Sequence, residues 1–215
     1  MKAHVPAVLA AMALGLLLAA CTATDAASSR AATSASTPSP SPTVAASPLP
    51  TPSEPNPELR AELVEMLAQD QADRFSGAGP GGDIDRTERL KEIIAAYGWP
   101  TISMVGEEGE DAAWAIAQHS DLDTEFQREA LELLRAAVAA GDASPGNLAY
   151  LEDRVAAGAG QPQTYGTQVG CGEDGPVPGT PIKDEANVDE RRADAGLPPL
   201  ADYYAEMAAI CAQDG

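Results

Sequence analysis

The sequence has few of the residues that build common catalytic and metal sites. It holds two histidines and three cysteines in 215 residues, and His4 and Cys21 fall within the first twenty-one. There is no HExxH segment and no pair of CxxC motifs, which argues against a dedicated zinc site. A GxSxG elbow and EF-hand spacing are also missing, and the glycines of residues 77–82 lack the lysine and hydroxyl of a phosphate loop. We therefore expect no metal and no cofactor.

Positive charge is also scarce. Thirteen Lys and Arg face 33 Asp and Glu, which gives a formal net charge of −20 at pH 7. Such a chain repels the phosphates of nucleic acid and the surface of anionic lipid, so we expect no nucleic-acid partner. A ligand or protein partner would be neutral or cationic. The alternative is that the charge serves solubility alone.

One apolar run stands out, and it covers residues 5–20. It follows the weakly basic start with Lys2 and His4 and ends in Leu18-Ala19-Ala20-Cys21. A basic start, an apolar middle and small residues at the end are typical of a secretory signal. The cysteine makes residues 1–20 resemble a bacterial lipoprotein signal, which implies cleavage before Cys21 and lipid on that residue. The alternatives are an ordinary signal peptide with an incidental cysteine, or a spanning anchor, for which the run is short and lacks a basic flank.

Residues 21–57 are expected to join the lipidated Cys21 to the rest of the chain as a disordered tether. Asp25, Arg30 and Glu54 are its charges among many Ser, Thr, Ala and Pro residues. Such a segment buries too little apolar surface to offset its ordering entropy, and its prolines favour extended chain. At about 3.1 Å per residue it would reach roughly 110 Å. This predicts a domain held away from the membrane on its extracytoplasmic side.

Residues 58–215 are predicted to form one acidic, mainly α-helical domain of six to seven helices. No long alternating strand occurs, and at most a small β-hairpin is expected near residues 164–169. Asn56-Pro57 predicts the first helix start, and an apparent capping box predicts the second start at Asp85. Residues 101–105 are expected to be extended or a turn. The expected helices cover residues 58–75, 85–97, 107–119, 124–140, 145–158, 188–195 and 199–212.

Two cysteines, Cys171 and Cys211, lie in this domain. Outside the membrane, the redox environment permits disulfides, and two cysteines allow one pairing. We expect a disulfide between them. The alternative is a pair of buried thiols.

Several polar motifs resemble the signatures of an uncharacterised bacterial family of domains of unknown function. The resemblance spans nearly all of residues 58–210, and its most specific part is Gln163-Thr-Tyr165-Gly-Thr-Gln168. It implies no activity, but it implies that these positions share one site or one structural core. The other matching elements are Asp70-Gln71, Arg74, Tyr97-Gly98-Trp99-Pro100, Gln118-His119, Phe126-Gln127 and Asp153-Arg154-Val155.

His119 is the strongest single candidate for chemistry. Its charge would change near neutral pH, and the C-terminal end of its helix would favour the protonated ring. Asp123 lies four residues further on and could orient it, while Asp153 could serve as a base. These three are the candidate catalytic residues. The alternative is a histidine that caps a helix or lies in the core with both nitrogens satisfied.

The candidate ligand-binding residues are rich in amides. Amide and phenol groups both donate and accept hydrogen bonds, which suits a neutral polar ligand such as a sugar or a peptide. The alternative is that the glutamines satisfy buried backbone groups and the tyrosine fills the core. Asp70 and Arg74, spaced i,i+4, are expected to form a helical ion pair. The candidates are Gln118, Gln127, Arg154, Gln163, Tyr165 and Gln168.

Three functions remain compatible with these patterns. The one we favour is a tethered binding module whose polar pocket is formed by His119, Gln163, Tyr165 and Gln168. The second is a cell-envelope enzyme of hydrolase type in which His119 moves a proton. The third is a structural lipoprotein whose polar motifs lock the helices together. Fold alone does not separate them, because function belongs to sites.

Overall fold

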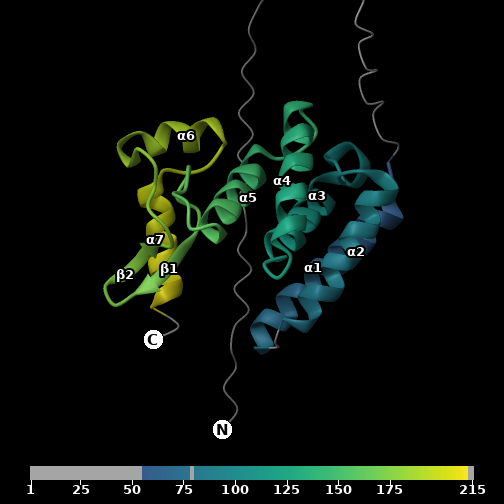
Figure 1. Ribbon diagram of the computed structural model, residues 1–215, viewed down its shortest axis with the longest axis horizontal. Coiled ribbons are helices and arrows are strands. Elements are labelled where there is room, and N and C mark those ends of the chain that lie inside the picture. The colour runs from purple at the N-terminus through teal and green to yellow at the C-terminus, as the bar shows by residue number, and fades with distance from the viewer. Residues whose placement is uncertain (1–54, 78–79, 213–215) are drawn as a thin grey trace, which may run out of the picture. The chain divides into compact units, whose positions relative to one another are not determined.

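A computed structural model describes residues 55–77 and 80–212, and seven α-helices account for most of them (Figure 1). The expected signal segment, Cys21 and the tether lie outside the described residues, apart from residues 55–57. Five helices come first in the chain, and a two-stranded sheet and two shorter helices follow. This confirms the prediction of a mainly α-helical fold with a small hairpin.

The first helix, α1 (Pro57–Ser76), is set by its own ends. The Asn56 side chain accepts a hydrogen bond from the Leu59 amide, and Pro57 occupies the first turn, as expected for a helix start. Gly77 ends the helix in a left-handed conformation at φ 69°. The buried face of α1 carries Leu59, Leu63, Met66 and also Asp70, a carboxylate in line with the apolar residues.

Helix α2 (Gly81–Tyr97) begins four residues earlier than the apparent capping box at Asp85 predicts. Its start at Pro80 has no side-chain cap. Instead, Asp83 in the first turn receives hydrogen bonds from Arg74 of α1 and from Arg86. These ion pairs, one with α1 and one within α2, stabilise a turn that two glycines alone would disfavour.

Helix α3 (Ile102–Gln118) includes the segment for which we expected an extended chain or a turn. Residues 102–105 are helical because Asp142, from a distant loop, accepts bonds from the amide and the hydroxyl of Ser103. Gly106, at φ 72°, then breaks the helix geometry. The structure therefore has a kink at Gly106, next to the predicted helix start at residue 107, inside one longer helix.

The two helices α4 (Thr124–Ala139) and α5 (Pro145–Gly158) follow the prediction closely. Asp123, rather than Thr124, caps α4 by accepting a bond from the Phe126 amide. Ser144 caps α5 by accepting a bond from the Asn147 amide. Helix α3 packs against α1, α2, α4 and α5, so these five helices share one apolar core. Its fully buried large side chains include Leu63, Leu90, Ile93, Ile116, Leu134 and Leu151.

The sheet pairs β1 (Val169–Gly172) with β2 (Gly175–Pro178) in antiparallel register, with Cys171 opposite Pro176. It begins where the expected hairpin range ends, and residues 164–168 form a loop instead. After it come a short 3₁₀ turn (Glu185–Asn187), α6 (Val188–Asp194) and α7 (Leu200–Cys211). These last elements lie together at the opposite end of the figure from α1 and α2 (Figure 1).

Two kinds of contact attach the last helix. A disulfide joins Cys171 on β1 to Cys211 on α7, which confirms the expected pairing. Aromatic rings make edge-to-face contacts from Trp114 on α3 through Tyr150 on α5 to Tyr203 on α7, with centroids 5.8 and 6.1 Å apart. The guanidinium of Arg192 then lies 5.1 Å from the Tyr203 ring centre. The aromatic contacts thus attach α7 to the helical core, and one covalent bond attaches it to the sheet.

Candidate functional site

His119 lies where α3 ends. Its backbone amide still bonds to the Ala115 carbonyl, so the residue is held in the final turn. Its ring Nδ1 lies 3.0 Å from a carboxylate oxygen of Asp70 on α1. A carboxylate only accepts, so Nδ1 carries the hydrogen and donates it. The other ring nitrogen, Nε2, has no hydrogen bond among the described residues.

Asp70 is held from two sides. It is fully buried, and both of its oxygens also accept bonds from Arg74, at 3.0 and 3.2 Å. This confirms the expected i,i+4 pair, although the aspartate is buried rather than exposed. Burial alone raises the pKa of Asp70, but the bonds and charge of Arg74, together with His119, hold that pKa below its usual value. Asp70 is therefore a fixed negative charge behind the imidazole.

Burial determines the charge of the ring. Desolvation lowers the pKa of His119, and the opposing attraction of Asp70 is smaller. The expectation that the protonated ring is favoured was therefore wrong, because removal from water and the positive charge of Arg74 lower the pKa by more than Asp70 raises it. At neutral pH the ring is a neutral imidazole, with its proton on Nδ1 and a free acceptor at Nε2.

Asp123 does not orient this ring. One of its oxygens caps α4, and the other binds the Lys91 ammonium at 2.6 Å. The hydrogen bond from Lys91 lowers the pKa of Asp123. The structure thus gives Asp70, from a helix far away in sequence, the position that the sequence suggested for Asp123.

A hollow of about 210 Å³ opens beside His119. Two of its lining side chains, Ile84 and Leu122, are apolar and 49 % and 64 % exposed. Two others, Thr87 and Ser120, are buried, and their hydroxyls lie 2.9 Å apart. The complete lining is Asp83, Ile84, Thr87, Glu88, His119, Ser120, Leu122 and Asp123.

The other polar motifs form a chain of hydrogen bonds that starts at the same helix end. The buried Gln127 amide donates to the carbonyls of Ala117 and Gln118 and to Asp121. Asp121 receives a two-pronged bond from Arg154, which also bonds to the Gln168 side chain at 3.1 Å. The side chain of Gln118 is buried, and its Oε1 has no protein partner among the described residues.

Asp153 anchors the loop that carries the most specific motif. It is fully buried on α5 and accepts bonds from the amides of Thr164, Tyr165 and Thr167, and from the Thr167 hydroxyl. These bonds span 2.6 to 3.2 Å. All four donors belong to the loop, so they hold its backbone in place. This explains why residues 164–168 form a loop instead of a strand.

The glutamines of the motif serve the same loop. Gln163 is fully buried, its Nε2 donates to the carbonyls of Gln168 and Thr180, and its Oε1 accepts from the Gln168 amide. The Gln168 side chain donates to the Tyr150 carbonyl and the Thr167 hydroxyl. Their hydrogen-bonding groups are thus used internally, which favours the structural interpretation of the sequence over a pocket wall.

Tyr165, like Gln163 and Gln168, is not part of the lining of the hollow at His119. Burial raises the pKa of its phenol, and the charges that act on it are those of Glu152, Asp153, Arg191 and Arg135. Its backbone carbonyl accepts a bond from the buried Arg192. The pocket that we predicted from His119 and the loop together therefore divides into two parts, a hollow at His119 and a hydrogen-bonded loop.

Gly166 explains the glycine of the motif. Its φ of 70° lies in the left-handed region, and a Cβ added there would come within 2.6 Å of the Ile182 side chain. Both the conformation and the space exclude a side chain. This glycine lets the loop close tightly over Ile182 and Leu200.

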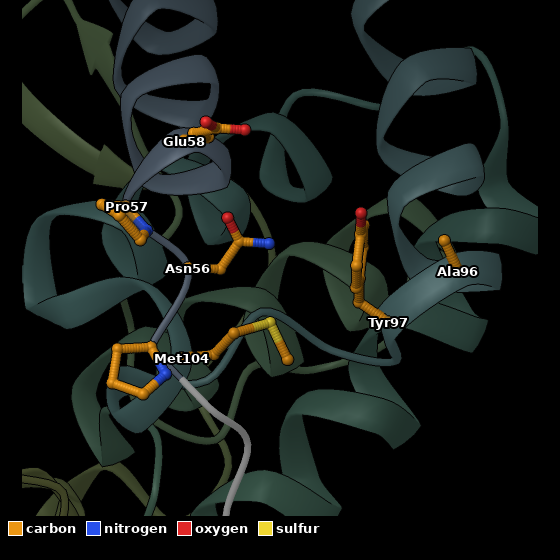
Figure 2. A pocket seen from close by; sticks show the side chains of 7 residues that line it. Asn56, Pro57, Glu58, Ala96, Tyr97 and Met104 are labelled. Carbon is orange, nitrogen blue, oxygen red and sulfur yellow. The ribbon is translucent and has the colours of Figure 1, made fainter.

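A larger hollow, of about 570 Å³, lies at the start of α1. In Figure 2 the Tyr97 ring faces the Asn56 side chain across it, and Met104 extends between them. It is a wide, open surface depression with no histidine in its lining. We therefore place the candidate site at His119, where the smaller hollow meets an oriented imidazole.

Sequence reasoning missed Glu110. This side chain is 1 % exposed, bonds to Asn147 at 2.9 Å, and leaves its Oε1 without a partner among the described residues. Burial raises its pKa to about 7. Its position three and seven residues before the buried Ala113 and Ala117 places it on the apolar face of α3, and that spacing could have revealed it.

Two features are absent from residues 55–77 and 80–212. None of their helices has the length and apolar character needed to cross a membrane. Their His, Cys, Asp and Glu side chains form no group of three or more that could hold a metal ion.

Comparison with known proteins identifies the family of this chain. The model of a family described as "Family of unknown function (DUF6624)" matches residues 60–210. The matched range includes the His119 hollow, the Asp153 loop and all but the end of α7. Neither the curated proteins nor the solved structures gave a match.

Proposed function

Since the chain belongs to this family of unknown function, we propose its role from the site: a membrane-anchored extracytoplasmic lipoprotein whose domain is a binding module with a polar pocket at His119. The anchor is the lipid on Cys21, and the tether carries the domain away from the membrane. The ligand is a neutral or cationic molecule or protein segment of the cell envelope.

The anchoring part rests on the sequence. The apolar run of residues 5–20, the small residues before Cys21 and the Pro-rich segment behind it support a lipid-modified secreted chain. A disulfide in the domain is consistent with an oxidising compartment.

A labelling experiment tests the anchor. The full chain, expressed in a bacterial host with radioactive palmitate, should incorporate label and sediment with membranes. Cys21→Ser should abolish both, while the neighbouring Thr22→Ser should change neither. Wild-type protein that carries no label and stays in the soluble fraction would refute the proposed lipid anchor.

One observation carries the binding function. His119 has one nitrogen fixed by Asp70 and the other free, beside a hollow lined partly by exposed apolar side chains. An oriented hydrogen-bonding group next to apolar surface is the usual composition of a small-molecule site. The neighbouring hydrogen-bonded loop keeps this end of the helices rigid, since Arg154 bonds to both Asp121 and Gln168.

A fragment screen tests this pocket without a known ligand. Small neutral and cationic compounds would be added to the folded domain, and signals of the His119 ring and the Leu122 methyl groups would be followed by NMR. We expect hits to cluster at these residues and to weaken in His119→Gln. Tyr97→Ala, in the larger hollow, is the matched control and should leave them unchanged. Hits that cluster at Tyr97 instead would refute the assignment.

The geometry also supports a second candidate, an envelope enzyme of hydrolase type. An imidazole whose Nδ1 proton is held by a carboxylate presents Nε2 as a general base. The nearby hydroxyls are poor nucleophiles, because Ser120 donates its hydrogen to the Ile116 carbonyl. Water would then be the nucleophile. Turnover of an envelope substrate that is lost in His119→Ala and falls with ring protonation would favour the enzyme, whereas unchanged turnover would exclude this role.

A further inference from the structure

The described side chains that line the hollow at His119 offer hydrogen-bond acceptors but no free hydrogen-bond donor. Ser120 donates its one hydroxyl hydrogen to the Ile116 carbonyl at 2.8 Å. In its 2.9 Å contact with Thr87 it must therefore accept, so Thr87 donates. Both hydroxyl hydrogens are used inside the protein. A ligand carbonyl or carboxylate would find no partner in these two side chains.

The remaining polar groups of the lining are acceptors. Nε2 of the neutral His119 ring is one, because the ring's proton faces Asp70. Asp83 uses Oδ1 for Arg74 and Arg86, and Glu88 uses Oε1 for Lys91. The second oxygen of each carboxylate has no hydrogen bond among the described residues. A ligand that binds here has to supply hydrogen-bond donors.

The net charge around the hollow also favours a ligand that donates hydrogen bonds. Three cations bond to carboxylates of the lining without forming part of it themselves, namely Arg74, Arg86 and Lys91. The carboxylates that hold them outnumber them, so the cluster remains negative. Those carboxylates are Asp70, Asp73, Asp83, Glu88 and Asp123. A donor group that is positively charged is favoured over a neutral one.

The apolar part of the lining favours an aliphatic group in the rest of the ligand. Ile84 and Leu122 line the hollow and remain exposed, so an aliphatic segment of the ligand would cover surface that water now touches. A hollow of about 210 Å³ has room for a short chain and its head group.

We propose that this pocket binds a primary ammonium group on a short aliphatic stem, with the ammonium at His119 Nε2 and Glu88 and the stem against Ile84 and Leu122. This rests on the proposed binding function and specifies its ligand class. A free alkylamine and an exposed lysine side chain carry the same chemistry.

Three probes of equal length test the head group: n-butylammonium, n-butanol and butyrate. At about pH 8 the amine stays protonated, since an alkylammonium of this kind titrates near pH 10.4. Binding is followed by NMR shifts of the His119 ring and the Leu122 methyl groups. We expect n-butylammonium to bind about 5-fold more tightly than n-butanol, and butyrate to bind most weakly. The peptide acetyl-Gly-Lys-Gly-amide separates the two sources, because it binds only if the pocket accepts a lysine within a chain.

Matched variants test the acceptor. Glu88→Gln removes one charge from α2 inside the lining, and we expect n-butylammonium to bind about 2- to 5-fold more weakly while n-butanol is unaffected. Glu92→Gln removes the same charge one turn further along the exposed face and should have little effect.

The outcomes separate the two proposals. If n-butanol or butyrate bound at His119 more tightly than n-butylammonium, the ammonium preference would be refuted but the proposed pocket would not. Equal weakening by Glu88→Gln and Glu92→Gln would reduce the effect to general charge and would also overturn it. If none of the three probes shifted the His119 and Leu122 signals of the folded protein, the proposed binding pocket itself would be refuted.

Discussion

The Nδ1 atom of His119 lies 3.0 Å from the carboxylate of Asp70, although 49 residues separate them in the sequence. This contact joins the end of α3 to the buried face of α1. It fixes the ring's tautomer and leaves Nε2 without a hydrogen bond among the described residues. An ion pair with the exposed Arg74 keeps the buried aspartate charged.

Replacing Asp70 should change the titration of His119. The charge of Asp70 raises the pKa of the ring against the effect of burial, so Asp70→Asn should lower that pKa further. An NMR titration of the ring signals measures this. Asp123→Asn is the control, because Asp123 binds Lys91 and the Phe126 amide instead of the ring. A larger shift in Asp123→Asn than in Asp70→Asn would contradict our assignment of the orienting residue.

Asp153→Ala should destabilise the domain strongly. Four buried or partly buried donors of the loop would lose their acceptor, and each unsatisfied group costs about 1–3 kcal/mol. We expect a total loss of about 3 kcal/mol or more in urea unfolding. The neighbouring Glu152→Gln removes a longer contact, 3.7 Å from Arg135, and should cost less than about 1 kcal/mol. Similar losses in both variants would show that the loop does not depend on Asp153.

The stability of the wild-type protein should depend on pH through Glu110. Its pKa is raised from 4.5 to about 7 on folding, so the folded state binds a proton that the unfolded state releases. Stability contributed by this proton is present below about pH 4.5 and is lost as pH rises to about 7. Glu110→Gln keeps a neutral group there. It should therefore exceed the wild type in unfolding free energy by on the order of 2–3 kcal/mol at pH 8, with the difference vanishing near pH 4.

Two comparisons check this interpretation of Glu110. Asp111, its neighbour, is exposed and also receives a bond from Asn147, so Asp111→Asn serves as the control and should not reproduce the pH-dependent gain. A difference between Glu110→Gln and wild type that stays constant from pH 4 to 8 would show that Glu110 is not the titrating group.

Loss of the disulfide should weaken the attachment of α7. The bridge closes a loop with a sequence separation of 40 residues, for which chain entropy gives about 4 kcal/mol. We expect the double variant Cys171→Ser, Cys211→Ser to melt at lower temperature and to exchange amide hydrogens faster in α7 than in α1. Faster exchange throughout all helices at once would indicate that α7 is not a separate unit.

Local patterns in the sequence predicted much of the fold. The Asn56-Pro57 cap located the start of α1, and the expected ranges of α1, α4 and α5 agree closely with the structure. The two cysteines of the domain left one possible pairing, and it forms. A helix cap depends on residues within a few positions of each other, and two cysteines allow only one disulfide pairing.

The errors have a common physical origin. Residues 102–105 are helical because Asp142 caps them from 39 residues away, and α2 starts early because Arg74 of another helix pairs with Asp83. The loop at residues 164–168 is shaped by Asp153. Periodicity describes one segment at a time, so a side chain that reaches across the fold changes the outcome without leaving a signal in that segment.

The position of the chain's entry has a mechanical consequence. Asn56 lies just before α1, and its amide donates a hydrogen bond to the Met104 carbonyl at 2.7 Å. Asp70 follows fourteen residues later in the same helix. At 1.5 Å per residue, about 20 Å of helix separates them. If the tether pulls the domain toward a membrane, the load enters at the start of α1 and is taken up by the contacts there. The contact of His119 with Asp70 lies further along the same helix, so the contacts of Asn56 meet this load first.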